Sequence, residues 1–250
     1  MQNIKLTNKQ LETLKSKHQL RDANGSEGQI YLYNDNGQKV AIKLFNTTNL
    51  NILENKEKKI ILLNKLPLNE NILKPIKTVS NNEQVIGYTQ ELIWPHHTFL
   101  ELKLLLLKKD KIDVLKQAKN LIGNLHNNGI VHGDIRSLNL LSQDKKVKIC
   151  DIDNCIIDGL NFDTYGWFTN DYNKNVKCID ERLDIFCFNL VTLALLKRIM
   201  DDTVYAHMKD AYIFNKDIKK IYEEMLNLTE NYNGEYLIDH INQKTKIKLL

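Results

Sequence analysis

The sequence at residues 130–141 is Ile-Val-His-Gly-Asp-Ile-Arg-Ser-Leu-Asn-Leu-Leu. Its apolar ends are typical of short β-strands, so the polar middle is expected to be a loop between them. The loop carries Asp134 and Asn139. A phosphoryl-transfer site needs a carboxylate that accepts the proton of the attacking hydroxyl, and an amide oxygen that helps to hold a metal ion on the phosphates. Asp134 and Asn139 are residue types suited to these two tasks.

Three other stretches carry related chemistry and stand in a fixed order around this loop. Residues 147–153 are Val-Lys-Ile-Cys-Asp-Ile-Asp, a predicted strand that ends at Asp151, and residues 40–43 are Val-Ala-Ile-Lys, a predicted strand that carries Lys43. Residues 23–30, Ala-Asn-Gly-Ser-Glu-Gly-Gln-Ile, include small residues that let backbone amides approach phosphate oxygens closely. Together the four stretches resemble the protein-kinase superfamily, whose catalytic loop reads His-Arg-Asp-Leu-x-x-x-Asn.

The resemblance implies an α+β, two-lobed protein-kinase-like fold. The N-terminal lobe, residues 1–92, is expected to hold a five-stranded antiparallel sheet and a helix at residues 50–66. The C-terminal lobe, residues 93–250, is expected to be mostly helical and abbreviated. Capping and apolar-spacing patterns predict further helices at residues 8–17, 98–108, 111–128, 184–196, 215–228 and 235–243.

The resemblance assigns the catalytic chemistry to the second lobe. Asp134 would be the catalytic base, and Arg136 would neutralise the charge of the phosphate that is transferred from ATP. Asn139 and Asp151 would hold the metal ion, which would be Mg²⁺ or, alternatively, Mn²⁺. Asp184, which opens a predicted buried helix, would brace the backbone of the catalytic loop.

The same resemblance places the nucleotide contacts mainly in the first lobe. Lys43 would contact the α- and β-phosphates of ATP and would be positioned by a glutamate of the next helix, Glu57 or alternatively Glu54. The remaining contacts would come from the phosphate-loop glycines, from the strand that carries Lys43 and from the hinge: Gly25, Gly28, Ala41, Glu91, Leu92 and Ile93, with Gln90 as gatekeeper.

The sequence departs from the family pattern at three places. Gly133 replaces the arginine before the catalytic aspartate, no Phe-Gly follows Asp151 as its next two residues, and no Ala-Pro-Glu follows downstream. These departures leave open a nucleotide-binding pseudokinase that acts by protein interaction, although every charged group that the chemistry needs is present. His-Gly-Asp also resembles aminoglycoside and choline kinases, so a small-molecule substrate is a second alternative. Arg136 stands where Ser/Thr protein kinases carry a lysine, so a protein Ser/Thr substrate is the leading expectation.

Composition limits the compartment and the partners. The net charge of +4, from 35 Lys and Arg against 31 Asp and Glu, is small and scattered, so it does not indicate nucleic-acid binding. Cys150, Cys155, Cys178 and Cys187 form no Cys-x-x-Cys pair, which is typical of free thiols in a reducing compartment. Since no apolar run is long enough to cross a bilayer, a soluble cytoplasmic protein without a membrane partner is expected, and the oligomeric state is left open.

Overall fold

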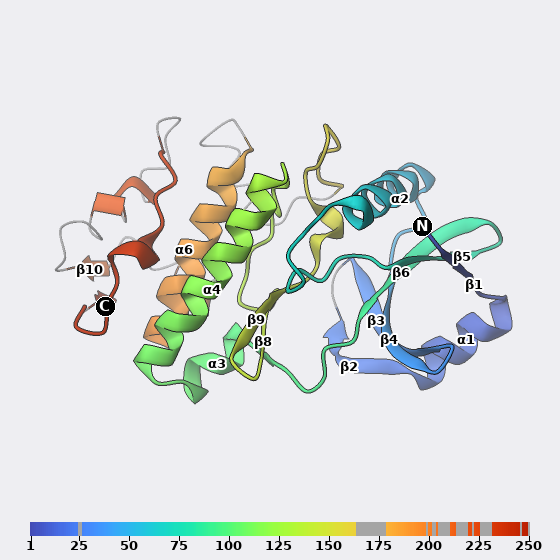
Figure 1. The fold of residues 1–250 in the computed structure, drawn as a ribbon, viewed down its shortest axis with the longest axis horizontal. Helices are drawn as coiled ribbons and strands as arrows, with labels where there is room; N and C mark the ends of the chain where they lie inside the picture. Colours follow the sequence, from blue (N-terminus) through green and yellow to red (C-terminus); the bar gives the residue numbers. More distant parts are fainter. Residues whose placement is uncertain are drawn as a thin grey trace. The chain divides into compact units, whose positions relative to one another are not determined.

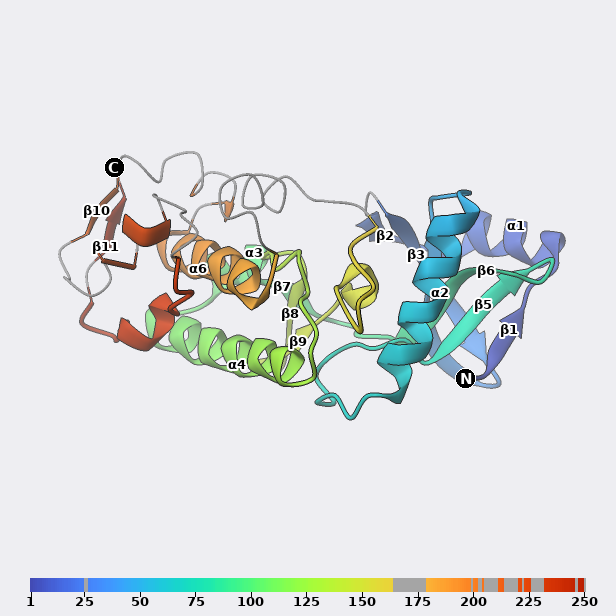
Figure 2. The same cartoon turned by 90° about the horizontal axis from the view of Figure 1, so that it is seen from above.

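The computed structural model describes residues 1–24, 27–163, 179–198, 200–201, 204, 211–213, 220–221, 223–225, 232–245 and 247–249. These residues form an α+β fold that divides into two compact units (Figures 1 and 2). The first unit comprises Met1–Trp94 and Ile152–Asp163, and the second comprises Pro95–Asp151 and the described residues after position 163. The sequence assigned the segment 152–163 to the C-terminal lobe, whereas it clusters with the first unit.

The first unit is built on a mixed six-stranded sheet with the order β1-β5-β6-β4-β3-β2. Its strands are β1 (Asn3–Lys5), β2 (Gln19–Asn24), β3 (Gly28–Asp35), β4 (Gln38–Phe45), β5 (Lys77–Asn81) and β6 (Gln84–Glu91). β1 runs parallel to β5, and the other neighbouring pairs are antiparallel. The expectation of a five-stranded antiparallel sheet was therefore wrong in one respect, since the sheet has a sixth strand, β1, which lies at its edge and is parallel. Three residues are too few to show the alternation that predicts a strand, so β1 gave no signal.

Helix α1 (Asn8–Lys17) packs against one face of this sheet. It begins with the predicted capping box, in which the Thr7 hydroxyl accepts from the Gln10 amide and the Gln10 side chain accepts from the Thr7 amide. Below it lies an apolar cluster of buried residues from the chain before α1, from α1 itself and from β3, β4 and β5: Leu6, Leu14, Tyr31, Ile42, Leu44 and Val79. The burial of these side chains anchors α1 to the sheet.

Helix α2 (Leu50–Lys65) lies over the opposite face of the sheet (Figure 1). Side chains alternate across a strand, so Lys43, between Ile42 and Leu44 on β4, points away from the α1 cluster and toward the α2 side. The 3₁₀ turn η1 (Ile152–Asn154) packs against α2. Lys43 and η1 therefore both lie on the α2 side of the first unit.

The second unit combines a three-stranded sheet with long helices. The sheet has the order β7-β8-β9 and consists of β7 (His97–Thr98), β8 (Leu140–Gln143) and β9 (Lys146–Ile149). The helices are α3 (Phe99–Leu105), α4 (Lys108–Asn127) and α6 (Glu181–Lys197), and α4 and α6 lie side by side in both views (Figures 1 and 2). Most residues of α6 are buried, as its nearly continuous apolar sequence predicts.

The loop 130–139 joins α4 to β8. Leu140 begins β8 as predicted, whereas Ile130 and Val131 are buried but lie outside the named strands. The first apolar flank of the loop therefore belongs to the core without extending the sheet.

Short elements end the described chain. η3 (Leu237–His240) is a 3₁₀ helix within the range 235–243 that was predicted as helical, and β10 (Ala211–Ile213) pairs antiparallel with β11 (Ile247–Leu249). Most of the helix predicted at 215–228 lies outside the described residues. Cys150, Cys155 and Cys187 are free thiols, and Cys178 is not among the described residues. None of the helices described for this chain is long and apolar enough to cross a membrane.

Candidate functional site

The loop that carries Asp134 is held by a buried aspartate of α6. The two carboxylate oxygens of Asp184 accept from the amides of His132 and Gly133, each at 2.8 Å. The same carboxylate lies 3.0 Å from Nε2 of His126 on α4. Asp184 therefore ties α4, α6 and the loop together, and the expected brace of the loop backbone is confirmed.

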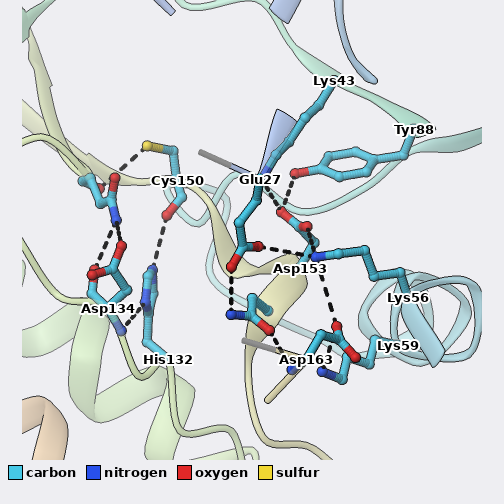
Figure 3. Close-up of polar contacts among 12 residues, drawn as sticks. Glu27, Lys43, Lys56, Lys59, Tyr88, His132, Asp134, Cys150, Asp153 and Asp163 are labelled. Atoms are coloured by element: carbon cyan, nitrogen blue, oxygen red, sulfur yellow. Dashed lines mark hydrogen bonds and ion pairs between the residues drawn. The ribbon is translucent and has the colours of Figure 1, made fainter. Parts of the chain in front are cut away.

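His132 links the same loop to the end of β9. Its Nδ1 accepts from the Asp134 amide at 3.2 Å, so Nε2 carries the proton and donates to the Cys150 carbonyl at 2.9 Å (Figure 3). Both ring nitrogens are thus used for backbone contacts. This geometry favours a structural role for His132 and leaves Asp134 as the candidate base.

The Asp134 carboxylate is fixed but accessible. Nδ2 of Asn139 donates to its Oδ2 at 2.9 Å and to the backbone carbonyl of Asp134 at 2.8 Å. Nε of Arg136 lies 3.2 Å from Oδ1, and the Asp134 side chain remains 38% exposed. Burial raises the pKa of the Asp134 carboxyl, and the positive charge of Arg136 offsets part of the rise. A carboxylate with a raised pKa is a better proton acceptor than an ordinary surface aspartate.

A backbone hydrogen bond connects Asn139 to Cys150, the residue before Asp151. The amide of Cys150 donates to the Asn139 carbonyl at 3.1 Å, which places Asp151 one residue from that contact. Because the Asn139 amide group donates to Asp134, its side-chain oxygen is directed away from the acceptors of Asp134. The charge of Asp151 also acts on Asp134, since it contributes to the raised pKa of that carboxyl.

These oxygens have the chemistry that Mg²⁺ prefers. Mg²⁺ is usually bound through one or two carboxylates together with phosphate oxygens and water, and rarely by a complete cage of side chains. Among the residues that the structure describes, no group of three or more His, Cys, Asp or Glu could hold a metal. The Asn139 side-chain oxygen and the Asp151 carboxylate are oxygen ligands of the type that Mg²⁺ accepts.

In the first unit, Lys43 is buried on β4 and meets a carboxylate. Its Nζ lies 2.6 Å from Oδ1 of Asp153, and the Tyr88 hydroxyl donates to the same oxygen at 2.9 Å (Figure 3). Lys43 and Tyr88 are partners in the β4–β6 register, so both side chains leave the sheet on the same face. Asp153 is fully buried between them.

The expected pairing of Lys43 with a helix glutamate is not what the structure shows. Glu54 is exposed and Glu57 is half-buried, and neither is a partner in the ion pairs described for Lys43. The helix α2 turns Lys56 toward Asp153 instead, because residue 56 falls on its buried face. The carboxylate that meets Lys43 therefore comes from η1.

Lys56 gives Asp153 a second cation. Its Nζ lies 2.9 Å from Oδ2 of Asp153 and 3.1 Å from a carboxylate oxygen of Glu27, which precedes β3. The other oxygen of Glu27 accepts from Asn154 at 2.8 Å. Burial opposes the charge of Asp153, but Lys43 and Lys56 together hold the pKa of that carboxyl well below its usual range.

Asp163 fastens the end of the segment 152–163 to the same helix. Its carboxylate binds Nζ of Lys59 at 3.1 Å and also accepts from the side chain of Asn55. Its amide donates to Asn154 at 2.7 Å. These contacts explain why the segment clusters with the first unit and not with the rest of the second half of the chain.

The remaining predicted nucleotide contacts lie around β3, β4 and β6. A Cβ at Gly28 would lie 2.6 Å from the Leu44 carbonyl oxygen, so glycine is required there by packing beside Lys43. Ala41 and Ile93 are buried, Glu91 is exposed at the end of β6, and Gly25 lies outside the described residues. Their contacts with a nucleotide stay predictions.

Sequence reasoning missed the role of Asp153 and its two lysines. A signal for Lys56 was present, since Leu53, Lys56, Ile60 and Leu63 follow helical spacing and share the buried face of α2. Asp153 carried no comparable signal, because its contact with Lys43 joins positions 110 residues apart.

A scan against protein-family models found no match for this chain, and a search of curated proteins found none either.

Proposed function

We propose that this chain is an ATP- and Mg²⁺-dependent kinase that transfers a phosphoryl group to a hydroxyl. The observation that carries the proposal is the half-exposed Asp134 carboxylate, which Asn139 and Arg136 contact in a loop braced by Asp184. Phosphoryl transfer depends mainly on the positioning of charged groups, and this loop holds a base, an amide oxygen and a cation within a few residues.

Asp134 acts as the proton acceptor in this mechanism. The oxygen of the attacking hydroxyl bonds to the γ-phosphorus of ATP while the bond from that phosphorus to the bridging oxygen of ADP breaks, and the hydroxyl proton moves to Asp134. The hydrogen bond from Asn139 keeps one carboxylate oxygen in place. Arg136, beside the other oxygen, supplies positive charge for the phosphoryl group in flight.

Mg²⁺ would be held by the Asn139 side-chain oxygen and by Asp151. When bound, it supplies charge neutralisation on the phosphate oxygens. Lys43 contributes a second positive charge for the α- and β-phosphates from the first unit.

A buried amide supports the choice of an adenine nucleotide. Gln90 is paired with Ala41 in the β4–β6 register, and its side-chain oxygen is buried without a hydrogen-bond partner among the described residues. Buried acceptors are normally satisfied, so this oxygen is suited to accept a hydrogen bond from a ligand. The exocyclic amino group of adenine is a donor of the required kind.

The acceptor is proposed to be a Ser or Thr hydroxyl of a protein. Arg136 carries this part of the proposal, because its guanidinium stands beside the proposed base, where it can bind the phosphate that passes to a protein hydroxyl.

The test is incubation of the purified protein with γ-labelled ATP and Mg²⁺, alone, with mixed proteins and with small alcohols including aminoglycosides. Label is expected on protein Ser or Thr, and Asp134→Asn is expected to lower the rate by roughly 10²- to 10⁴-fold. Asp144→Asn is the matched control, since Asp144 is an exposed aspartate of the same unit. Transfer to a small alcohol alone would replace the protein substrate, and equal rates in wild type and Asp134→Asn would remove the base assignment.

The second candidate is a pseudokinase that binds nucleotide without turnover. The sequence departures favour it, since no Phe-Gly follows Asp151 directly and no Ala-Pro-Glu follows downstream. Binding of ATP, measured by calorimetry, without label transfer to protein, small alcohol or water would select this candidate.

A further inference from the structure

We infer that Asp153 is the positioning residue for Lys43 and that Lys56 is its counter-cation, in place of a helix glutamate. The inference rests on the proposed function, in which Lys43 contacts the nucleotide phosphates. It assigns to η1 and to a lysine of α2 the task that the resemblance had given to Glu57 or Glu54.

The first argument is the completeness of the contacts around Asp153. Oδ1 is bound by Lys43 at 2.6 Å and by the Tyr88 hydroxyl at 2.9 Å, and Oδ2 is bound by Lys56 at 2.9 Å. Both oxygens are thus oriented, and the side chain is fully buried. A carboxylate held in this way can fix the direction of the Lys43 ammonium, which by itself is a flexible point charge on a long stem.

The second argument is the direction in which α2 presents its charges. Lys56 and Lys59 are buried, whereas Glu54 is exposed. At the position that faces Asp153, α2 therefore presents the Lys56 ammonium and not a carboxylate. Helix α2 thus supplies a second cation, Lys56, which helps to keep Asp153 ionised although the carboxylate is buried. Burial of a charge is costly unless its ion pairs offset the loss of solvation.

The third argument is charge balance. Three lysines, Lys43, Lys56 and Lys59, meet three carboxylates, Asp153, Asp163 and Glu27, within the first unit. Removal of Asp153 alone leaves an uncompensated buried cation, which is strongly destabilising. Removal of Asp153 and Lys56 together keeps the net charge, and it leaves Lys43 without its carboxylate and Glu27 without its lysine.

Because the double variant keeps the net charge, it can distinguish a positioning role of Asp153 from simple neutralisation of the buried lysines. The variants are Asp153→Asn, Lys56→Met and the double variant, and the control is the double variant Asp35→Asn with Lys77→Met, which removes a separate ion pair of the same unit. Circular dichroism and thermal unfolding establish folding, and we expect the Asp153→Asn/Lys56→Met protein to be more stable than Asp153→Asn. Binding of Mg-ADP and of adenosine is then measured by calorimetry.

Positioning predicts that the Asp153→Asn/Lys56→Met protein binds Mg-ADP about tenfold or more weakly than wild type, because the orienting charged hydrogen bond is lost. Adenosine, which lacks phosphates, should bind equally to both proteins, and the control pair should change neither affinity. Mg-ADP affinity equal to or above that of wild type in the folded double variant would overturn the inference, because Asp153 would then serve charge balance alone.

The two proposals fail in different ways. A wild-type protein that binds neither Mg-ADP nor adenosine would refute the proposed function. Wild-type binding together with unchanged Mg-ADP affinity in the double variant would refute only the role of Asp153.

Discussion

Asp151 has a φ of +65°, in the left-handed region that few residues other than glycine occupy. Asp and Asn are the side chains that tolerate this region best, because their short polar groups can bond locally. A strained residue persists where its surroundings hold it, and here the preceding amide is bound to the Asn139 carbonyl. The same position is the candidate metal ligand.

Because of this conformation, two substitutions of Asp151 should separate the effect of its charge from its effect on backbone stability. Asp151→Asn should keep the fold and remove the charge, so Mg²⁺ should no longer strengthen ADP binding. Asp151→Ala should in addition lower the free energy of unfolding by about 1 kcal/mol, because alanine adopts the left-handed region less readily than Asp or Asn. The measurements are calorimetry of ADP at increasing Mg²⁺ and urea unfolding.

Asp144→Asn is the control for both measurements, since Asp144 also has a positive φ, of 50°, and has no assigned role. An Asp151→Asn protein with the Mg²⁺ dependence of wild type would end the metal assignment. Asp153 would not then be the substitute ligand, because Lys43 and Lys56 already bind its carboxylate.

At the scale of elements, local patterns predicted helices better than they predicted which side chains meet. The spacing of apolar residues gave residues 50–66 for a helix that spans Leu50–Lys65. The same spacing puts Lys56 on the buried face, but a lysine on a helix is normally exposed, so its inward direction was not predicted. The pairing of Asp134 with Asn139 was predictable because these residues are five positions apart, whereas the partner of Lys43 depends on a contact between distant segments.

Lys111, on α4 of the second unit, is another buried lysine, and it binds backbone carbonyls. From α4 its Nζ donates to the carbonyls of Lys103 at 2.7 Å and Leu195 at 2.9 Å, near the ends of α3 and α6. Carbonyls in the last turn of a helix lack intrahelical donors, so Lys111 satisfies two of them. Burial, and then the charge of Arg198, lower its pKa from 10.5 to about 8.

A pH dependence of stability follows from this lowered pKa. Between pH 8 and 10.5 the unfolded chain keeps the proton of Lys111 while the folded chain releases it. The unfolded state therefore binds more protons, and the free energy of unfolding should rise with pH in this window, by up to about 1.4 kcal/mol for each pH unit. Lys111→Met should lack this rise.

The measurement is urea unfolding at pH 7.5, 9 and 10 for wild type, Lys111→Met and the control Lys116→Met, in which an exposed lysine of the same helix is removed. The difference between wild type and Lys111→Met is the quantity to compare, because it cancels the titration of other groups. A difference that is constant with pH would contradict the lowered pKa of Lys111.

At the scale of the whole molecule, the first unit is not continuous in sequence. It needs Ile152–Asp163, which returns after the loop and β8 and β9 of the second unit. A fragment of residues 1–94 would contain all six strands of the sheet but would leave Lys43 and Lys59 without Asp153 and Asp163. Each unpaired buried charge costs about 3–5 kcal/mol, against a total stability of about 5–15 kcal/mol.

The fragment 1–94 is therefore expected to be unfolded at pH 7, as judged by amide dispersion in NMR spectra and by the absence of cooperative thermal unfolding. The same fragment with Lys43→Met and Lys59→Met should recover structure, because the unpaired charges are removed. A cooperatively folded wild-type fragment at pH 7 would show that the ion pairs of the segment 152–163 are dispensable for the sheet.

The acceptor substrate is a property of the whole molecule. The role of Arg136 allows a protein acceptor to be tested against a small-molecule acceptor. Its guanidinium lies 3.2 Å from Asp134, so its removal should weaken stabilisation of the transferred phosphate without affecting the Lys43 contacts with ATP. Arg136→Ala is expected to lower kcat for a protein acceptor by at least about tenfold at an unchanged KM for ATP. Arg136→Lys keeps the charge and should recover part of the rate.

The decisive comparison is between acceptors in the same assay. If Arg136 serves transfer to a protein hydroxyl, label on Ser and Thr should fall in Arg136→Ala and partly return in Arg136→Lys, while hydrolysis of ATP by water changes less. If Arg136 is only a surface partner of Asp134, its pairing energy is small and all three proteins should label protein at similar rates. A wild type that labels an aminoglycoside or another small alcohol and no protein would move the acceptor site to small molecules, because the guanidinium would then have no protein-bound phosphate to meet.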